Sequence, residues 1–146
     1  DSSAAALERA RQNAERNGLE NITFIEADAF EYLKSAERAR ERFDTVVLDP
    51  PAFAKTKRTV GSAVRGYKEI NLRGMRLLAR GGLLYTASCS FHLGKAEFLE
   101  MLEAAAADSG RWLALREVLG QPVDHPEILT IPETGYLKGA IVEALD

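Results

Sequence analysis

Two short motifs hold the residue types that could do chemistry. Asp49 opens the stretch Asp-Pro-Pro-Ala-Phe, directly after the apolar run Phe43–Leu48. Cys89 lies in Thr-Ala-Ser-Cys-Ser, directly after the apolar residues 83–87. If both runs are neighbouring parallel strands, their carboxyl ends meet at one edge of the sheet. The sequence therefore predicts a carboxylate and a thiol at the same cleft.

Such a pair suits methylation of a pyrimidine at carbon 5, which is too weak a nucleophile until something adds to carbon 6. A Cys89 thiolate can add there, while Asp49 hydrogen-bonds or protonates the ring near nitrogen 3. A base then removes the carbon 5 proton, and the thiolate leaves. Because a free thiol has a pKa of about 8.5, the site must lower that pKa or supply a base, and Lys55 and Lys68 are the candidate cations.

Other interpretations of these motifs stay open. Asp49 could cap a turn before the two prolines, and a lone cysteine such as Cys89 is often a small buried hydrophobe. An adenine amino-methyltransferase could use Asp49-Pro50-Pro51 to polarise an exocyclic amine and Phe53 to stack a flipped base, without needing Cys89. A third hypothesis is a non-catalytic fragment that only dimerises or docks.

Two further carboxylates fit a cofactor role. Asp1 and Asp28 could accept hydrogen bonds from ribose hydroxyls or from an adenine amino group, as carboxylates at strand exits do. Each also has a structural alternative, because Asp1 could cap the first helix and Asp28 the second. Phe30 could line an adenine pocket, but its helical spacing to Leu33 favours core packing.

The spacing of apolar residues predicts helices that alternate with strands. Helices are expected over residues 2–17, 30–38, 67–78 and 95–108, and strands over 22–27, 43–48, 83–87, 112–118 and 136–144. Gly18 and the pair Gly81-Gly82 mark helix ends, residues 52–61 should form a mobile loop, and residues 120–135 should be irregular. This alternation predicts an α/β fold with a parallel-rich sheet and helices on both faces.

Composition narrows the classes of protein further. The 146 residues, 46% of them hydrophobic, suit a single domain over residues 1–146. No apolar run approaches the roughly 20 residues needed to cross a bilayer. One cysteine and two distant histidines give no metal site, and we expect a cytoplasmic protein without metal. The net charge of -3 means that RNA binding requires a local patch or another domain.

The sequence resembles the catalytic domain of RlmI-type ribosomal RNA large-subunit methyltransferases, which make 5-methylcytosine. The resemblance covers nearly the whole chain and rests on residues 13–18, 27–30, 43–53, 66–71, 88–90, 124–126 and 136–139. Related RNA cytosine methyltransferases often carry a second cysteine after the two prolines, where this chain has Ala52. The absence of that cysteine fits the RlmI type.

The resemblance implies a Rossmann-like class I methyltransferase sheet, mostly parallel with an antiparallel last strand. It implies S-adenosyl-L-methionine as cofactor and ribosomal RNA as substrate, with Cys89 as nucleophile and Asp49 at the reaction centre. By the same similarity Asp1 would bind the cofactor ribose and Asp28 the adenine. The remaining expected contacts are Ala29 and Asp49 for the cofactor, and Pro50, Pro51, Phe53, Tyr67 and Lys68 for the substrate.

The family also has an RNA-binding PUA domain, a linking domain and a strand with a glycine-rich cofactor loop ahead of this region. None of these occurs in the sequence. The resemblance therefore implies a fold truncated at its N-terminal end, which by itself binds the cofactor weakly or not at all. It also implies an unpaired edge on strand 43–48, which favours a homodimer or strand exchange.

Overall fold

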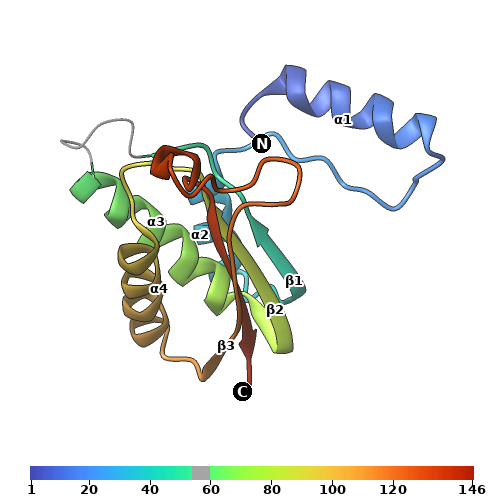
Figure 1. Cartoon of the computed structure of the whole chain (residues 1–146). Helices are drawn as coiled ribbons and strands as arrows, with labels where there is room; N and C mark the ends of the chain where they lie inside the picture. Colours follow the sequence, from blue (N-terminus) through green and yellow to red (C-terminus); the bar gives the residue numbers. More distant parts are fainter. Residues whose placement is uncertain (54–59) are drawn as a thin grey trace.

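The computed structural model describes residues 1–53 and 60–146, and helices and strands alternate along much of its length (Figure 1). The helices are α1 (Ala4–Arg16), α2 (Ala29–Arg38), α3 (Val60–Arg76) and α4 (Lys95–Ser109). The strands are β1 (Phe43–Leu48), β2 (Leu78–Ser88), β3 (Leu113–Leu119) and β4 (Lys138–Ala144). Between β3 and β4 the chain is irregular, as predicted, apart from an isolated β-bridge and a short 3₁₀ turn at Pro132–Thr134.

The strands form one sheet in the order β1-β2-β4-β3. β1 pairs with β2 in parallel, and β4 lies between β2 and β3 and is antiparallel to both. Strands β1, β2 and β3 therefore run in the same direction and the last strand runs in the opposite one. The predicted sheet, mostly parallel with an antiparallel last strand, is confirmed.

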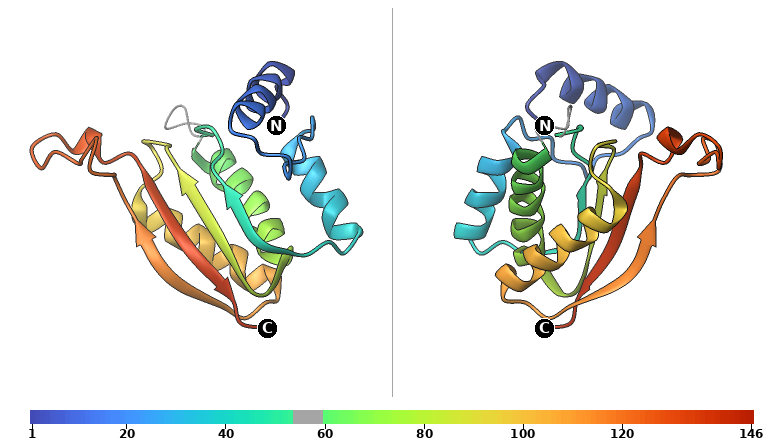
Figure 2. Two further views of the ribbon diagram at one scale, coloured as in Figure 1. Left: turned by 90° about the vertical axis from the view of Figure 1, so that its right-hand side faces the viewer. Right: turned by 60° about the vertical axis from the view of Figure 1, so that its left-hand side comes forward.

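Helices α2, α3 and α4 lie next to one another on one face of this sheet (Figure 2). Tyr67, Leu84 and Phe98 are fully buried in the core between these helices and the strands. α3 approaches the strands closely because Gly74 has no side chain, and a Cβ there would lie 3.0 Å from Leu48 Cδ1. α1 lies apart from these three helices, on the other side of the sheet (Figure 1), and its Leu7 lines a pocket together with Thr45 and Val47 of β1.

The ends of α1 follow from local hydrogen bonds. Ser3 caps this helix, because its hydroxyl accepts a hydrogen bond from the amide of Ala6 at 3.2 Å. The structural alternative in which Asp1 caps the helix is therefore wrong. Beyond the helix, Gly18 has a φ of +64°, a conformation that favours glycine, and it ends the helix where the sequence predicts.

Residues 22–27 are extended, but the predicted strand is not formed there. Asp1 donates its amino hydrogen to the carbonyl of Ile25 at 3.1 Å and accepts the amide of Ala27 at 3.0 Å. These two bonds have the pattern of a parallel pair. A strand needs a longer run of partners, and Asp1 is the only described residue that pairs with this segment.

Helix α3 begins at Val60 and ends at Arg76, earlier at both ends than predicted. Gly81 and Gly82 therefore lie within β2 and do not end the helix. Gly81 has a φ of +74°, and a Cβ on Gly82 would lie 2.9 Å from the carbonyl oxygen of Ala79 and 3.0 Å from that of Phe43. The loop predicted over residues 52–61 falls largely on 54–59, which lie outside the described residues.

We predict that Gly82→Ala lowers the free energy of unfolding by about 1–3 kcal/mol, because backbone oxygens occupy the space that the new methyl group needs. Gly120→Ala is the matched control, since nothing lies within 4 Å of a Cβ at that position. Urea unfolding of both variants measures the difference. Equal stability of the two would contradict the close packing of Gly82.

Candidate active site

A cleft of about 400 Å³ lies at the carboxyl end of β1. Its wall includes Val47, Leu48 and Ile70 from β1 and α3, which make part of the surface apolar. Most of the predicted site residues line it: Asp1, Asp28, Ala29 and Asp49 of the cofactor set, and Pro50, Pro51 and Phe53 of the substrate set. Parallel α/β sheets bind ligands at this edge, so the cleft is the candidate binding site.

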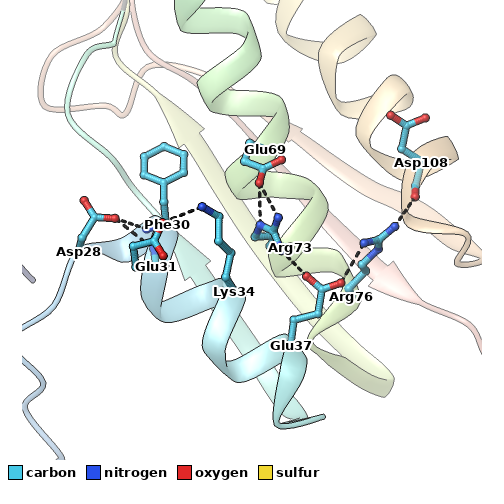
Figure 3. A network of polar contacts seen from close by, with 9 residues as sticks. All are labelled: Asp28, Phe30, Glu31, Lys34, Glu37, Glu69, Arg73, Arg76 and Asp108. Atoms are coloured by element: carbon cyan, nitrogen blue, oxygen red, sulfur yellow. Dashed lines mark hydrogen bonds and ion pairs between the residues drawn. The ribbon is translucent and has the colours of Figure 1, made fainter.

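Asp28 has a structural role in this cleft as well as a predicted chemical one. Its Oδ1 atom accepts the amides of Phe30 at 2.9 Å and Glu31 at 3.1 Å, which caps α2 (Figure 3). The capping alternative for Asp28 is therefore confirmed. The cap uses one carboxylate oxygen, and within residues 1–53 and 60–146 the other oxygen has no hydrogen-bond partner.

A partly buried charge network fixes α2 against α3 (Figure 3). Glu37 of α2 accepts hydrogen bonds from Arg73 at 2.5 Å and from Arg76 at 2.9 Å, both on α3. Arg73 also pairs with Glu69 at 2.7 Å, and its side chain is only 19% exposed. Shared, partly buried pairs of this kind hold two elements more firmly than isolated surface pairs do. The network thereby fixes the position of Asp28 at the start of α2.

The parallel pairing of β1 and β2 positions Asp49 and Cys89. Leu48 is opposite Thr86 in the register of the two strands, Asp49 follows Leu48, and Cys89 comes three residues after Thr86. Both residues therefore leave the sheet at the same edge. Asp49 is exposed, and Cys89 is partly buried.

Tyr67 joins the loops that follow these two strands. Its hydroxyl accepts the amide of Phe53 at 3.3 Å and shares a hydrogen bond with the hydroxyl of Ser90 at 2.8 Å. Its ring lies 4.5 Å from that of Phe53, between centroids. Because the Tyr67 side chain is fully buried, it offers no surface to a substrate in this structure. The predicted substrate contact is corrected to a bracing role.

Lys68 does not lie where a cation for Cys89 would be needed. Its ammonium forms an ion pair with Asp108 at 2.6 Å. Asp108 is near the C-terminal end of α4. Gly94, which caps the other end of this helix and follows Cys89 closely in the chain, lies about 20 Å away along the helix. The expectation that Lys68 supplies this cation is wrong, and the other candidate, Lys55, lies outside the described residues.

A different cation, Lys138 at the start of β4, lies beside Cys89. The Lys138 side chain is almost completely buried, at 3% exposure, and its Nζ atom donates to the carbonyls of Ser90 at 2.6 Å and Tyr136 at 2.8 Å. Burial lowers the pKa of Lys138, while the nearby charges of Cys89 and Glu97 act to raise it. Sequence reasoning missed this residue. The available signal was a lysine at the start of an otherwise apolar strand.

Two other kinds of feature are absent from residues 1–53 and 60–146. No group of three or more histidine, cysteine, aspartate or glutamate side chains there is arranged to hold a metal ion. No helix in the same residues has the length and apolar character needed to span a membrane.

Comparison with protein families decides the kind of domain. Residues 1–123 match the family described as "Methyltransferase domain". The chain belongs to this family. The methyltransferase domain is 46% identical over 146 residues to ribosomal RNA large subunit methyltransferase I of Aeromonas salmonicida, covering 99% of the chain and 37% of the relative. The same-named protein of Photobacterium profundum is 43% identical, with 95% and 36% covered.

Solved structures show that the methyltransferase domain shares its fold with known proteins. SMU.776, complexed with SAH, matches with a TM-score of 0.83 at 21% identity, over 98% of this chain and 37% of its own. NSun6 from Pyrococcus horikoshii, solved with SFG, matches with a TM-score of 0.72 at 17% identity, over 100% and 40%. The chain therefore spans between 36% and 40% of the length of these relatives and structures.

Proposed function

We propose that this methyltransferase domain transfers a methyl group from S-adenosyl-L-methionine to carbon 5 of a cytosine in large-subunit ribosomal RNA, through a covalent adduct with Cys89. The observation that carries the proposal is the parallel pairing of β1 and β2, because Asp49 directly follows β1 and Cys89 directly follows β2. The relatives named as ribosomal RNA methyltransferases support the class of substrate.

The cleft at the end of β1 fits this cofactor. Carboxylates of Asp1 and Asp28 can accept hydrogen bonds from ribose hydroxyls and an adenine amino group, and Val47 and Ile70 offer apolar surface to a purine ring. The bound cofactor supplies a methyl group on a sulfonium, which a carbon nucleophile can take. Two matched structures contain SAH or SFG, which supports the same cofactor for this domain.

Asp49 and Cys89 have different roles at the cytosine ring. The Cys89 sulfur forms a bond to carbon 6, and the electron pair displaced from the carbon 5–carbon 6 double bond makes carbon 5 nucleophilic. Asp49 hydrogen-bonds the ring near nitrogen 3 and stabilises the charge that develops there. After methylation a base removes the carbon 5 proton, the double bond reforms, and the bond to sulfur breaks. Cys89 is then regenerated as a thiolate.

A pair of Asp28 variants separates cofactor binding from helix capping. In the full-length protein we expect Asp28→Asn to keep the cap and to weaken cofactor binding about tenfold, because a charge-assisted hydrogen bond is lost. Asp28→Ala should also lower the free energy of unfolding by about 1 kcal/mol. Calorimetric titration and urea unfolding measure the two effects. Wild-type cofactor affinity in Asp28→Asn would contradict the cofactor role of this carboxylate.

The thiol step is tested by Cys89→Ala in the full-length protein. We expect loss of methyl transfer to ribosomal RNA with cofactor binding retained, because Cys89 does not line the cofactor cleft. With wild-type protein, RNA containing 5-fluorocytosine should form a denaturation-resistant complex, since fluorine at carbon 5 cannot leave as a proton and the sulfur stays bound. Gel mobility of the complex and mass spectrometry of the Cys89 peptide provide the readout.

The same variant also tests the alternative chemistry. Methylation that survives Cys89→Ala, together with methylated adenine in the digested RNA, would favour the adenine amino-methyltransferase that uses Asp49-Pro50-Pro51. If neither base is methylated by the wild-type full-length protein, the non-catalytic alternative gains support. The two assays therefore distinguish all three hypotheses.

Self-association of the 146-residue chain is a separate prediction. β1 is one of the two edge strands of the described sheet, and Val47 on it is 64% exposed. Unpaired backbone groups on an edge strand favour pairing with a second copy. We expect sedimentation equilibrium to give twice the mass of the chain. A stable monomer at micromolar concentration would contradict this prediction.

A further inference from the structure

The turn that contains Cys89 is held from the neighbouring strand. Lys138 of β4 is opposite Ser88 in the antiparallel register of β2 and β4. From there its side chain reaches the carbonyl of Ser90, to which Nζ donates at 2.6 Å. Lys138 is therefore connected to the residue before Cys89 by strand pairing and to the residue after it by a hydrogen bond. This geometry places a buried ammonium at the turn.

The charge of this ammonium is not cancelled by a direct partner. Within residues 1–53 and 60–146, Lys138 forms no ion pair with a carboxylate, and its two hydrogen bonds go to neutral carbonyls. Glu97 of α4 acts on it electrostatically, but the Glu97 carboxylate itself accepts the amide of Gly94 at 2.9 Å. Cys89 is the other group whose charge acts on Lys138. A negative charge on the Cys89 sulfur would complement this buried cation.

The same hydrogen bonds extend to the loop that follows β1. Lys138 donates to the carbonyl of Ser90, the Ser90 hydroxyl shares a hydrogen bond with Tyr67, and Tyr67 accepts the amide of Phe53. Ser90 and Tyr67 are fully buried, so these contacts are shielded from water. Lys138 therefore belongs to a chain of contacts that links both loops of the candidate active site.

We propose that Lys138 is a positioning residue for Cys89: its ammonium holds the turn at Ser90 and stabilises the thiolate that attacks the cytosine. This inference rests on the proposed function, because the positive charge of Lys138 affects the reaction only if the Cys89 sulfur is the nucleophile. Lys138 also supplies the cation near Cys89 that was expected from the sequence and that Lys68 does not supply. The role is electrostatic and is exerted through Cys89, so Lys138 itself need not contact the substrate.

The test is the rate at which iodoacetamide alkylates Cys89 in the full-length protein without RNA or cofactor. The thiolate displaces iodide and forms a carbon–sulfur bond, so the rate reports the thiolate fraction. We expect Lys138→Gln to slow alkylation at pH 7 about tenfold, because the thiolate loses a nearby positive charge. At pH 10 the variant should match the wild type, because the thiol then ionises without help. Mass spectrometry of the Cys89 peptide gives the rates.

Matched variants separate charge from structure. Lys138→Gln keeps hydrogen-bond donors and Lys138→Met removes them, so the proposal expects both to react slowly at pH 7. Lys95→Gln removes an exposed charge at the start of α4 and should change the rate less than twofold, because solvent screens it. Wild-type rates in Lys138→Gln would overturn the proposal. Slow reaction at both pH 7 and pH 10 would also overturn it, because that outcome indicates a distorted turn.

One further variant keeps a positive charge at this position. Lys138→Arg retains a cation that can donate to the Ser90 carbonyl, so alkylation of Cys89 at pH 7 should be faster than in Lys138→Gln. A rate as slow as that of Lys138→Gln would contradict the electrostatic role. Because alkylation uses neither RNA nor cofactor, it gives an answer even if Cys89→Ala retains methyl transfer and the proposed function fails.

Discussion

The parallel pairing of β1 with β2 is the constraint on which the candidate site depends. It sets Leu48 opposite Thr86, and this register brings the loop of Asp49 and the turn of Cys89 to one edge of the sheet. Close packing of α3 supports the pair, because Gly74 lets the helix backbone approach Leu48. A shift of the register would move one loop relative to the other by about 3.3 Å per residue, more than catalytic geometry tolerates.

Strand pairing places the two loops only approximately, and hydrogen bonds between polar groups in the core fix their positions more closely. Buried polar atoms need partners, and here Tyr67, Ser90 and Lys138 satisfy one another across α3, β2 and β4. Hydrocarbon packing alone would allow the loops to slide, whereas hydrogen bonds fix distances and directions. A buried lysine is costly because burial disfavours its charged form. Its presence beside a partly exposed cysteine is more easily explained by chemistry than by stability.

Periodicity and strand-end motifs predicted much of this arrangement, while tertiary contacts decided the rest. The four helices, the strand Phe43–Leu48 and the cleft residues Asp28 and Asp49 follow from local pattern and from the rule for parallel sheets. The prediction of a strand over residues 22–27 was wrong because a strand depends on a partner as well as on its own composition. The roles of Tyr67 and Lys138 could not be predicted, since a hydroxyl or ammonium reaches residues distant in sequence and its partners depend on the fold.

The case of Asp28 shows that a structural explanation of a residue need not compete with a functional one. Capping α2 occupies Oδ1, and the amides of Phe30 and Glu31 hold the carboxylate in one orientation at the cleft. In the proposed cofactor complex, the second oxygen would meet the ligand without the entropy cost of ordering a free side chain. The network of Glu37 with Arg73 and Arg76 extends this order by anchoring α2 itself. Preorganisation for binding thus arises from the same bonds that stabilise the helix.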